Sequence, residues 1–153
     1  MDSKLSQRLA GIIDALPLKD DIRILEIGCG PGAMARAISG RIKEGYILAI
    51  DRSGKAIRQA LAGSGEEMET GKLAFRQCAI EKFEPGPSEK PFDIAIAVRV
   101  GALDGRHPEI EQQALANIAK ALTKNGKLFI DGGNPLKEIP LDKYRQGKQA
   151  GNL

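Results

Sequence analysis

The chain has 153 residues, of which 42% are apolar and 28% are charged, and this composition is typical of a soluble globular protein. The length predicts a single domain over residues 1–153, without a separate substrate domain. The net charge of +3 is small and the Lys and Arg residues are scattered, so nothing indicates a nucleic-acid surface.

The sequence has no stretch typical of a membrane or secreted protein. Residues 1–16 lack a long apolar core and an Ala-x-Ala site, and no segment approaches about 18 uninterrupted apolar residues. Two cysteines and one histidine are too few for a disulfide scaffold or a tetrahedral metal site. We therefore expect a cytoplasmic protein with free thiols, no metal and no membrane contact.

The first predicted element is a helix whose apolar residues lie on one stripe that packs on a sheet. Ser3 is a candidate N-cap, and Pro17 ends the helix before the first strand. The stripe consists of Leu5, Leu9, Ile12, Ile13 and Leu16.

Most of the information about function lies in one glycine-rich stretch. Residues 22–27 form an apolar, β-branched run, as expected of a buried strand in a parallel sheet. Gly28, Gly30 and Gly32 follow it, and they let a bulky ligand lie directly against the main chain. Residues 33–38 then predict a helix whose free N–H groups and positive dipole end face that ligand.

The next predicted strand, residues 46–50, ends on an acidic residue. In a βαβ unit a carboxylate at this place accepts both hydroxyls of a ribose, and here it is Asp51. The glycines and the acid also satisfy the dinucleotide fingerprint GxGxxG/A. Glu26 adds negative charge that repels a pyrophosphate, and Pro31 removes an amide that a diphosphate would use. These two residues favour a ligand with a cationic end.

The remaining elements alternate along the chain. We expect a helix from Ser53 that weakens at residues 63–65, a solvated acidic patch at 66–69 and a strand at 73–78. A surface loop at 84–91 leads to a central strand at 92–98 and a loop at 99–107. The last elements are a helix that begins at Pro108 and ends at Asn125-Gly126, and a strand at 127–131. This alternation predicts an α/β fold, a doubly wound and mostly parallel sheet of about five strands with helices on both faces. Its ligand site lies where strand order reverses, between the first and fourth strands.

The chain resembles the class I S-adenosylmethionine-dependent methyltransferases, because four of their landmarks occur in order. They are EIGCGPG at 26–32, Asp51 after its strand, FDIAIAV at 92–98 and LTKNGKLFI at 122–130. The resemblance implies a Rossmann-like fold, S-adenosyl-L-methionine as the cofactor, and methyl transfer to a small molecule or a protein side chain. A small-molecule acceptor is the favoured one.

The resemblance also implies the residues that contact the cofactor. They are Glu26, Gly28, Cys29, Gly30 and Gly32 around the methionine part, Asp51 at the ribose diol, Arg52, Cys78 and Ala79 at the adenine, and Val98, Arg99 and Val100 at the methionine end and the reacting methyl.

Two departures from the family pattern change these expectations. The aspartate that usually accepts from the adenine amine is missing, and Cys78-Ala79 stands in its place, so we expect backbone groups of Ala79 to contact the adenine. Few residues follow Asp131, too few for the usual helix and pair of strands. We therefore expect a sheet whose last edge is covered by a partner or by the tail itself, which favours a homodimer.

Candidate chemical roles have open alternatives. His107 either takes a proton from an acceptor hydroxyl or amine, or is an exposed residue at a helix entry. Arg99 and Arg106 either hold a substrate carboxylate or phosphate, or pair with Asp104 or Glu109. Cys29 lies near a helix N-terminus, but no base accompanies it, so a small packed residue is the simpler interpretation.

Two other functions remain open at this point. The glycine fingerprint also fits an NAD-binding or nucleotide-binding domain, and the short C-terminus also fits a non-catalytic S-adenosylmethionine-binding subunit. Binding of S-adenosylhomocysteine without binding of NAD would separate the first of these from a methyltransferase.

Overall fold

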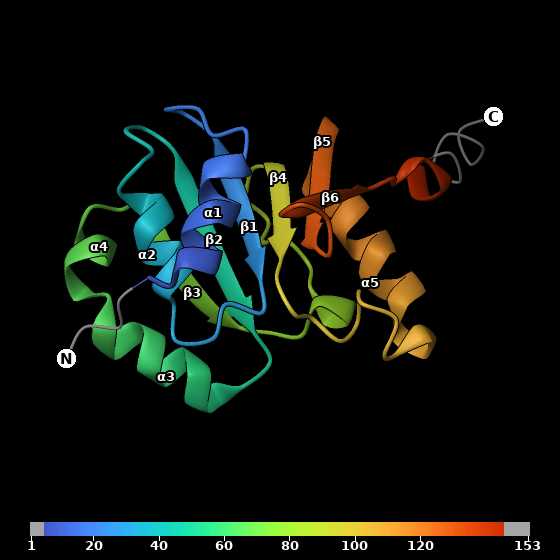
Figure 1. Ribbon diagram of the computed structural model, residues 1–153, viewed down its shortest axis with the longest axis horizontal. Helices are drawn as coiled ribbons and strands as arrows, with labels where there is room; N and C mark the ends of the chain where they lie inside the picture. Colours follow the sequence, from blue (N-terminus) through green and yellow to red (C-terminus); the bar gives the residue numbers. More distant parts are fainter. Residues whose placement is uncertain (1–4, 146–153) are drawn as a thin grey trace.

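A six-stranded sheet forms the centre of this computed structural model, which describes residues 5–145 (Figure 1). The strands are β1 (Arg23–Ile27), β2 (Tyr46–Asp51), β3 (Leu73–Gln77), β4 (Phe92–Ala97), β5 (Leu122–Asp131) and β6 (Leu136–Ile139). Their order in the sheet is β3-β2-β1-β4-β5-β6, and every pair is parallel except β5 with β6. The order reverses between β1 and β4, as the sequence predicts.

Helices cover both faces of the sheet. They are α1 (Gln7–Ala15), α2 (Ala33–Ser39), α3 (Gly54–Gly63), α4 (Gly65–Glu69), the 3-10 helix η1 (Ile80–Lys82) and α5 (Pro108–Ala121). Figure 1 shows α1 and α2 in front of the sheet, and α5 beside β5. No helix in the described part of the chain is long and apolar enough to cross a lipid bilayer.

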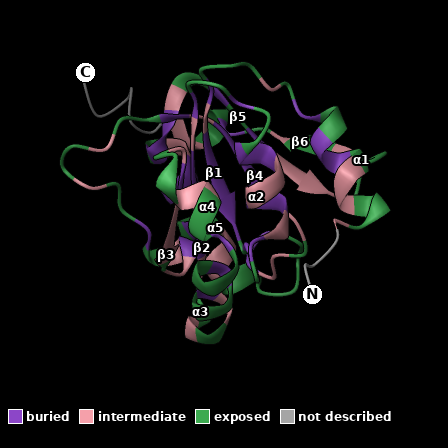
Figure 2. Ribbon diagram, turned by 90° about the vertical axis from the view of Figure 1, so that its left-hand side faces the viewer, coloured by how far each residue is buried: buried purple, intermediate pink, exposed green. Residues whose placement is uncertain are grey.

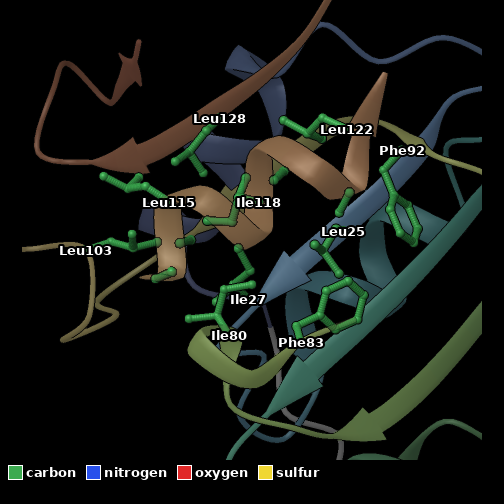
Figure 3. Packing of buried hydrophobic residues seen from close by; sticks show 14 of the residues in the cluster. Leu25, Ile27, Ile80, Phe83, Phe92, Leu103, Leu115, Ile118, Leu122 and Leu128 are labelled. Atoms are coloured by element: carbon green, nitrogen blue, oxygen red, sulfur yellow. The ribbon is translucent and has the colours of Figure 1, made fainter. Parts of the chain in front are cut away.

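The pleat of β1 assigns its side chains to two separate cores. Ile24 belongs to the core that contains residues of α1, α2 and α3, whereas Leu25 and Ile27 belong to the core that contains residues of η1 and α5. In Figure 3, Leu25 and Ile27 point toward Ile80 of η1 and Ile118 of α5. Because β1 has strands on both sides and helices on both faces, its apolar run needs no polar alternation.

The distribution of burial follows from this layering. Figure 2 shows buried residues concentrated on the central strands and exposed residues on the outer turns of α3 and α4. Glu26 is the exception among the central strands, because it is a carboxyl residue with only 3% of its surface exposed. It lies two residues after Ile24 and therefore faces α1 and α2.

The α/β fold class predicted from the sequence is confirmed, and the elements before residue 120 lie close to their expected places. The N-cap of α1 is Ser6, whose hydroxyl accepts from the Leu9 N–H, while Ser3 lies outside the described residues. The short helix α4 was not expected. It begins after Ser64, which is fully buried and accepts a hydrogen bond from Arg36, so the Gly63–Gly65 segment is a junction between two helices.

The end of α5 and the last edge of the sheet differ from expectation. The helix ends at Ala121, and Asn125-Gly126 lies inside β5, where the pairing with β4 jumps from Leu122 to Lys127. A Cβ on Gly126 would lie 2.8 Å from the Leu122 Cβ, so the irregular segment depends on a glycine. The prediction that Asn125-Gly126 ends the helix is therefore wrong. The sheet also has a sixth strand, because the tail itself folds back as β6 and covers the edge of β5.

Candidate functional site

The candidate site lies at the carboxyl ends of β1, β2, β4 and β5. Parallel strands bring their carboxyl ends to one edge of the sheet, so residues far apart in the sequence meet there. Gly28 follows β1, Asp51 ends β2, Arg99 follows β4 and Asp131 ends β5.

The glycine loop after β1 is held in a conformation that requires glycines. The φ angles of Gly28, Gly30 and Gly32 are +73°, +56° and +92°. A Cβ on Gly28 would lie 2.7 Å from the Val100 Cγ2, whereas a Cβ on Gly30 would meet no atom within 4 Å. The loop therefore packs tightly at Gly28 and faces open space at Gly30.

Asp51 ties the glycine loop to the end of β2. Its Oδ2 accepts from the Gly30 N–H at 2.8 Å and its Oδ1 accepts from the Ser53 N–H at 2.9 Å. An ionised carboxylate can accept about four hydrogen bonds, so each oxygen retains capacity for a further donor. The loop and the acid predicted to bind one ligand are thus in direct contact.

Two neighbouring cavities open beside this loop. The Glu26 cavity has a volume of about 480 Å³ and is lined by Glu26, Gly28, Met34, Val98 and residues of α1. The Asp51 cavity has a volume of about 200 Å³ and is lined by Gly28, Asp51, Arg52, Cys78, Ala79 and Val100, among others. Gly28 and Arg99 line both cavities, so one elongated ligand can occupy the two.

Glu26 is a buried carboxyl residue that lacks a hydrogen-bond partner at one of its oxygens, Oε1, in the described part of the chain. Burial, and secondarily the negative charge of Asp51, raise the pKa of Glu26 to about 8. A buried carboxyl without a partner destabilises the charged state, and a cationic group in the Glu26 cavity would supply the missing partner.

The turn after β3, where the usual adenine-binding aspartate is absent, places a backbone N–H group at the Asp51 cavity. Cys78 donates its N–H to the Asp51 carbonyl at 2.9 Å, which fixes the turn after β3. The next N–H, that of Ala79, donates to no group among residues 5–145. Ala79 therefore has a free donor on the wall of the Asp51 cavity, and the expected contact of its backbone with the ligand stays a prediction.

The loop after β4 begins with a strained residue. Arg99 has a φ of +57°, an unfavourable value for a non-glycine residue. Its N–H donates to Asp131 Oδ1 at 3.0 Å, and Asp131 Oδ2 accepts from Arg8 Nη2 at 2.7 Å. Asp131 thus connects the loop, β5 and α1. Sequence reasoning missed Arg8 and Asp131, because 123 positions separate them and neither belongs to a motif.

A third cavity, the Lys137 cavity, lies on the β5 side of this loop. Its volume is about 440 Å³, and Arg99, Asp104, Arg106, Asp131 and Lys137 contribute to its wall. Arg106 pairs with Asp104 at 2.8 Å, which is one of the two alternatives left open by the sequence. Both predicted arginines nevertheless line the cavity. Lys137 was not predicted, because it belongs to the unexpected strand β6.

His107 lies outside the cavities, and the two cysteines lack the features of reactive thiols. His107 is exposed at the N-cap of α5, and its Nδ1 lies 3.3 Å from Glu109 Oε1. It is absent from the walls of the cavities described above. Burial, followed by the charges of Glu26 and Asp51, raises the pKa of the Cys29 thiol, and burial also raises that of Cys78. Neither cysteine has the lowered pKa of a reactive nucleophile.

Comparisons with known proteins agree with this geometry. A family model described as a methyltransferase domain matches residues 18–151. YrhH of Bacillus subtilis, named as a methyltransferase, is 28% identical over 78% of this chain and 62% of its own length. Trans-aconitate 2-methyltransferase of Methylobacterium nodulans is 26% identical over 84% of this chain and 45% of its own length.

Among solved structures, phosphoethanolamine N-methyltransferase 2 of Haemonchus contortus has a similar fold, with a TM-score of 0.64 at 23% identity. That similarity covers 81% of this chain and 27% of the other. The chain spans less than two thirds of the length of each of these three proteins. The family model matches most of the chain, and the sheet order and glycine loop agree with it. The chain therefore belongs to the class I methyltransferase family, as a methyltransferase domain.

Proposed function

We propose that this chain binds S-adenosyl-L-methionine and transfers its methyl group to a small-molecule acceptor. The observation that carries the proposal is the buried Oε1 of Glu26, which has no hydrogen-bond partner within residues 5–145 and lies in the wall of a cavity beside the glycine loop. A diphosphate would be repelled there, whereas a ligand with an ammonium and a sulfonium group would neutralise the carboxylate.

The residues of the two cavities fit this ligand. The nucleoside end would occupy the Asp51 cavity, with Asp51 accepting from the ribose hydroxyls and Arg52, Cys78 and Ala79 along the adenine. The methionine end would occupy the Glu26 cavity, against Glu26, Cys29, Val98 and the main chain of Gly28. Gly30 lines neither cavity, so its contact with the cofactor stays a prediction. Gly32 keeps the loop closely packed, because a Cβ there would lie 2.9 Å from the Phe75 Cζ.

The protein contributes mainly alignment and exclusion of water to such a reaction. When bound, the cofactor would supply an electrophilic methyl group on its sulfonium for transfer to an acceptor lone pair. Val98 and Arg99 line the Glu26 cavity at the strand end where the methyl group would lie. The role of His107 as a base stays a prediction. Its exposed imidazole lies beside Glu109 and lines none of the three cavities.

The names of the relatives support a small-molecule acceptor, since trans-aconitate methyltransferase acts on a small acid by its name. The cytoplasmic location and the single domain over residues 1–153 also stay predictions. Two unpaired thiols, Cys29 and Cys78, support the location. The main argument for a homodimer was an uncovered edge of β5, and β6 covers that edge.

Calorimetry with S-adenosylmethionine, S-adenosylhomocysteine and NAD tests the proposal directly. We expect both adenosyl ligands to bind and NAD not to bind. The pKa of Glu26 is about 8 in the ligand-free protein, and pairing with a cationic ligand would lower it. Binding should therefore release a proton, and the affinity should increase as the pH rises toward 8. Glu26→Gln should weaken binding about tenfold or more and remove that pH dependence.

A glycine pair provides a matched control. Gly28 and Gly71 have φ angles of +73° and +79°, but only at Gly28 would a Cβ meet another atom within 4 Å. Gly28→Ala should therefore abolish binding, while Gly71→Ala should cost stability alone. Binding of NAD in place of the adenosyl ligands would contradict the proposal. Binding without transfer in a broad acceptor screen would instead support the non-catalytic subunit.

A further inference from the structure

The Lys137 cavity adjoins the two cavities assigned to the cofactor. Arg99 lines all three of them, so this residue lies at the boundary between the cofactor cavities and the Lys137 cavity. A molecule in the Lys137 cavity would therefore lie beside the place proposed for the reacting methyl group.

The charges on its wall are not balanced. Both carboxylates are already paired, Asp104 with Arg106 at 2.8 Å and Asp131 with Arg8 at 2.7 Å. Within the part of the chain that the structure describes, the side chains of Arg99 and Lys137 make no ion pair or hydrogen bond. Two cations without partners thus face one cavity of about 440 Å³.

The main chain that carries Arg99 is fixed from both sides. Its N–H donates to Asp131 Oδ1 at 3.0 Å, and its carbonyl accepts from Arg106 Nη2 at 3.3 Å. These bonds hold the left-handed conformation of the residue. Strain of this kind persists where the surrounding contacts enforce it, and here those contacts come from the other residues of the cavity wall.

We propose that the Lys137 cavity holds an anionic group of the methyl acceptor, a carboxylate or a phosphate, through Arg99 and Lys137 with Arg106 beside them. This inference rests on the proposed methyl transfer and adds the chemical class of its acceptor. Arg99 and Arg106 have planar guanidinium groups suited to bidentate contacts with either anion, while Lys137 adds a single point charge.

Amide NMR of the 16.4 kDa protein with three probes tests the inference without any turnover. Citrate represents the carboxylates, inorganic phosphate represents the phosphates, and triethyl citrate is the neutral match of the first. We expect shifts at Arg99, Gly132 and Lys137 with citrate, with phosphate or with both, and none with the ester. The anion that binds more tightly identifies the anionic group.

A pair of lysines provides the matched variants. Lys137→Gln removes a charge from the cavity wall, whereas Lys124→Gln removes an exposed charge that lines none of the cavities described above. Lys137→Gln should weaken anion binding about tenfold, and Lys124→Gln should leave it unchanged. A dispersed spectrum and an unchanged melting temperature would show that Lys137→Gln is folded. Lys137→Glu should weaken binding further.

The outcomes separate this inference from the proposed function. Shifts spread over the whole surface, equal weakening by the two lysine variants, or no shift with either anion would overturn it, even where calorimetry detects S-adenosylhomocysteine. Failure of S-adenosylhomocysteine to bind would instead refute the proposed function, whatever the anions do. Localised shifts that only Lys137→Gln and Lys137→Glu weaken would support an anionic acceptor.

Discussion

At the scale of single residues, Glu26 is the most informative position in the chain. A carboxyl group on the central strand cannot improve packing, and its Oε1 has no partner among the described residues. Burial of such a group costs free energy unless it is protonated or meets a cation. The cationic ligand proposed for the Glu26 cavity would supply the partner that the fold does not.

This cost predicts how stability depends on pH in the absence of ligand. The pKa of Glu26 is about 8 in the folded protein and 4.5 in a model peptide, so between these values the folded state binds more protons than the unfolded one. The free energy of unfolding should then fall as pH rises from 4.5 to 8, by at most ~1.4 kcal/mol per pH unit.

Urea unfolding of Glu26→Gln across this pH range checks the prediction. The variant cannot ionise, so its stability should exceed that of the wild type increasingly as pH rises. Glu66→Gln, at an exposed site on α4, is the control and should follow the wild-type curve. A constant difference between wild type and Glu26→Gln over all pH values would show that Glu26 does not titrate in this way.

At the scale of elements, η1 is positioned by a buried polar contact from α5. The Asn117 Nδ2 donates to the Ile80 carbonyl at 3.0 Å, and Gln113 donates to the Asn117 Oδ1 at 2.9 Å. Ile80 and Glu81 line the Asp51 cavity. A helix on one face of the sheet thus holds a wall of the proposed nucleoside site.

Asn117→Leu should therefore affect both stability and binding. The substitution removes one of two hydrogen bonds to the Ile80 carbonyl, which keeps the Phe83 N–H at 3.1 Å, so it should lower the free energy of unfolding by about 1 kcal/mol. It should also weaken binding of S-adenosylhomocysteine, measured by calorimetry. Gln113→Ala, which leaves the bond to Ile80 intact, should cost less than Asn117→Leu. Equal losses from the two variants would contradict this role.

At the scale of the whole molecule, β6 completes the sheet and carries one wall of the Lys137 cavity. It pairs antiparallel with β5 from Leu128 to Asp131. Leu141, just beyond it, is 3% exposed and belongs to the core of α5 and η1. The tail therefore covers an edge that would otherwise offer unpaired N–H and carbonyl groups.

Two truncated chains test the importance of β6. A chain that ends at Gly133 lacks the strand, so we expect it to be less stable and to self-associate, as seen by sedimentation velocity. A chain that ends at Arg145 keeps every described residue and should sediment like the full chain. A stable chain ending at Gly133 with unchanged sedimentation would show that the edge of β5 needs no cover.

The sequence alone determined the α/β class, the order of the strands and main helices up to α5, and the placement of the glycine loop and Asp51 at one edge of the sheet. These features follow from local patterns, because apolar runs, glycines and helix caps act within a few residues, and parallel strands must then bring their carboxyl ends together. The missing adenine aspartate was also visible, whereas only the structure shows that the Ala79 N–H has no acceptor among residues 5–145.

The tertiary structure alone decided the rest. Three features have no local signature: the return of the tail as β6, the connection of Arg8 to Asp131 across 123 positions, and the position of Lys137 on a cavity wall. Each depends on which distant side chains meet, and hydrophobic periodicity does not carry that information. The face toward which Glu26 points required the pleat of β1, and its lack of a partner required every neighbour to be placed.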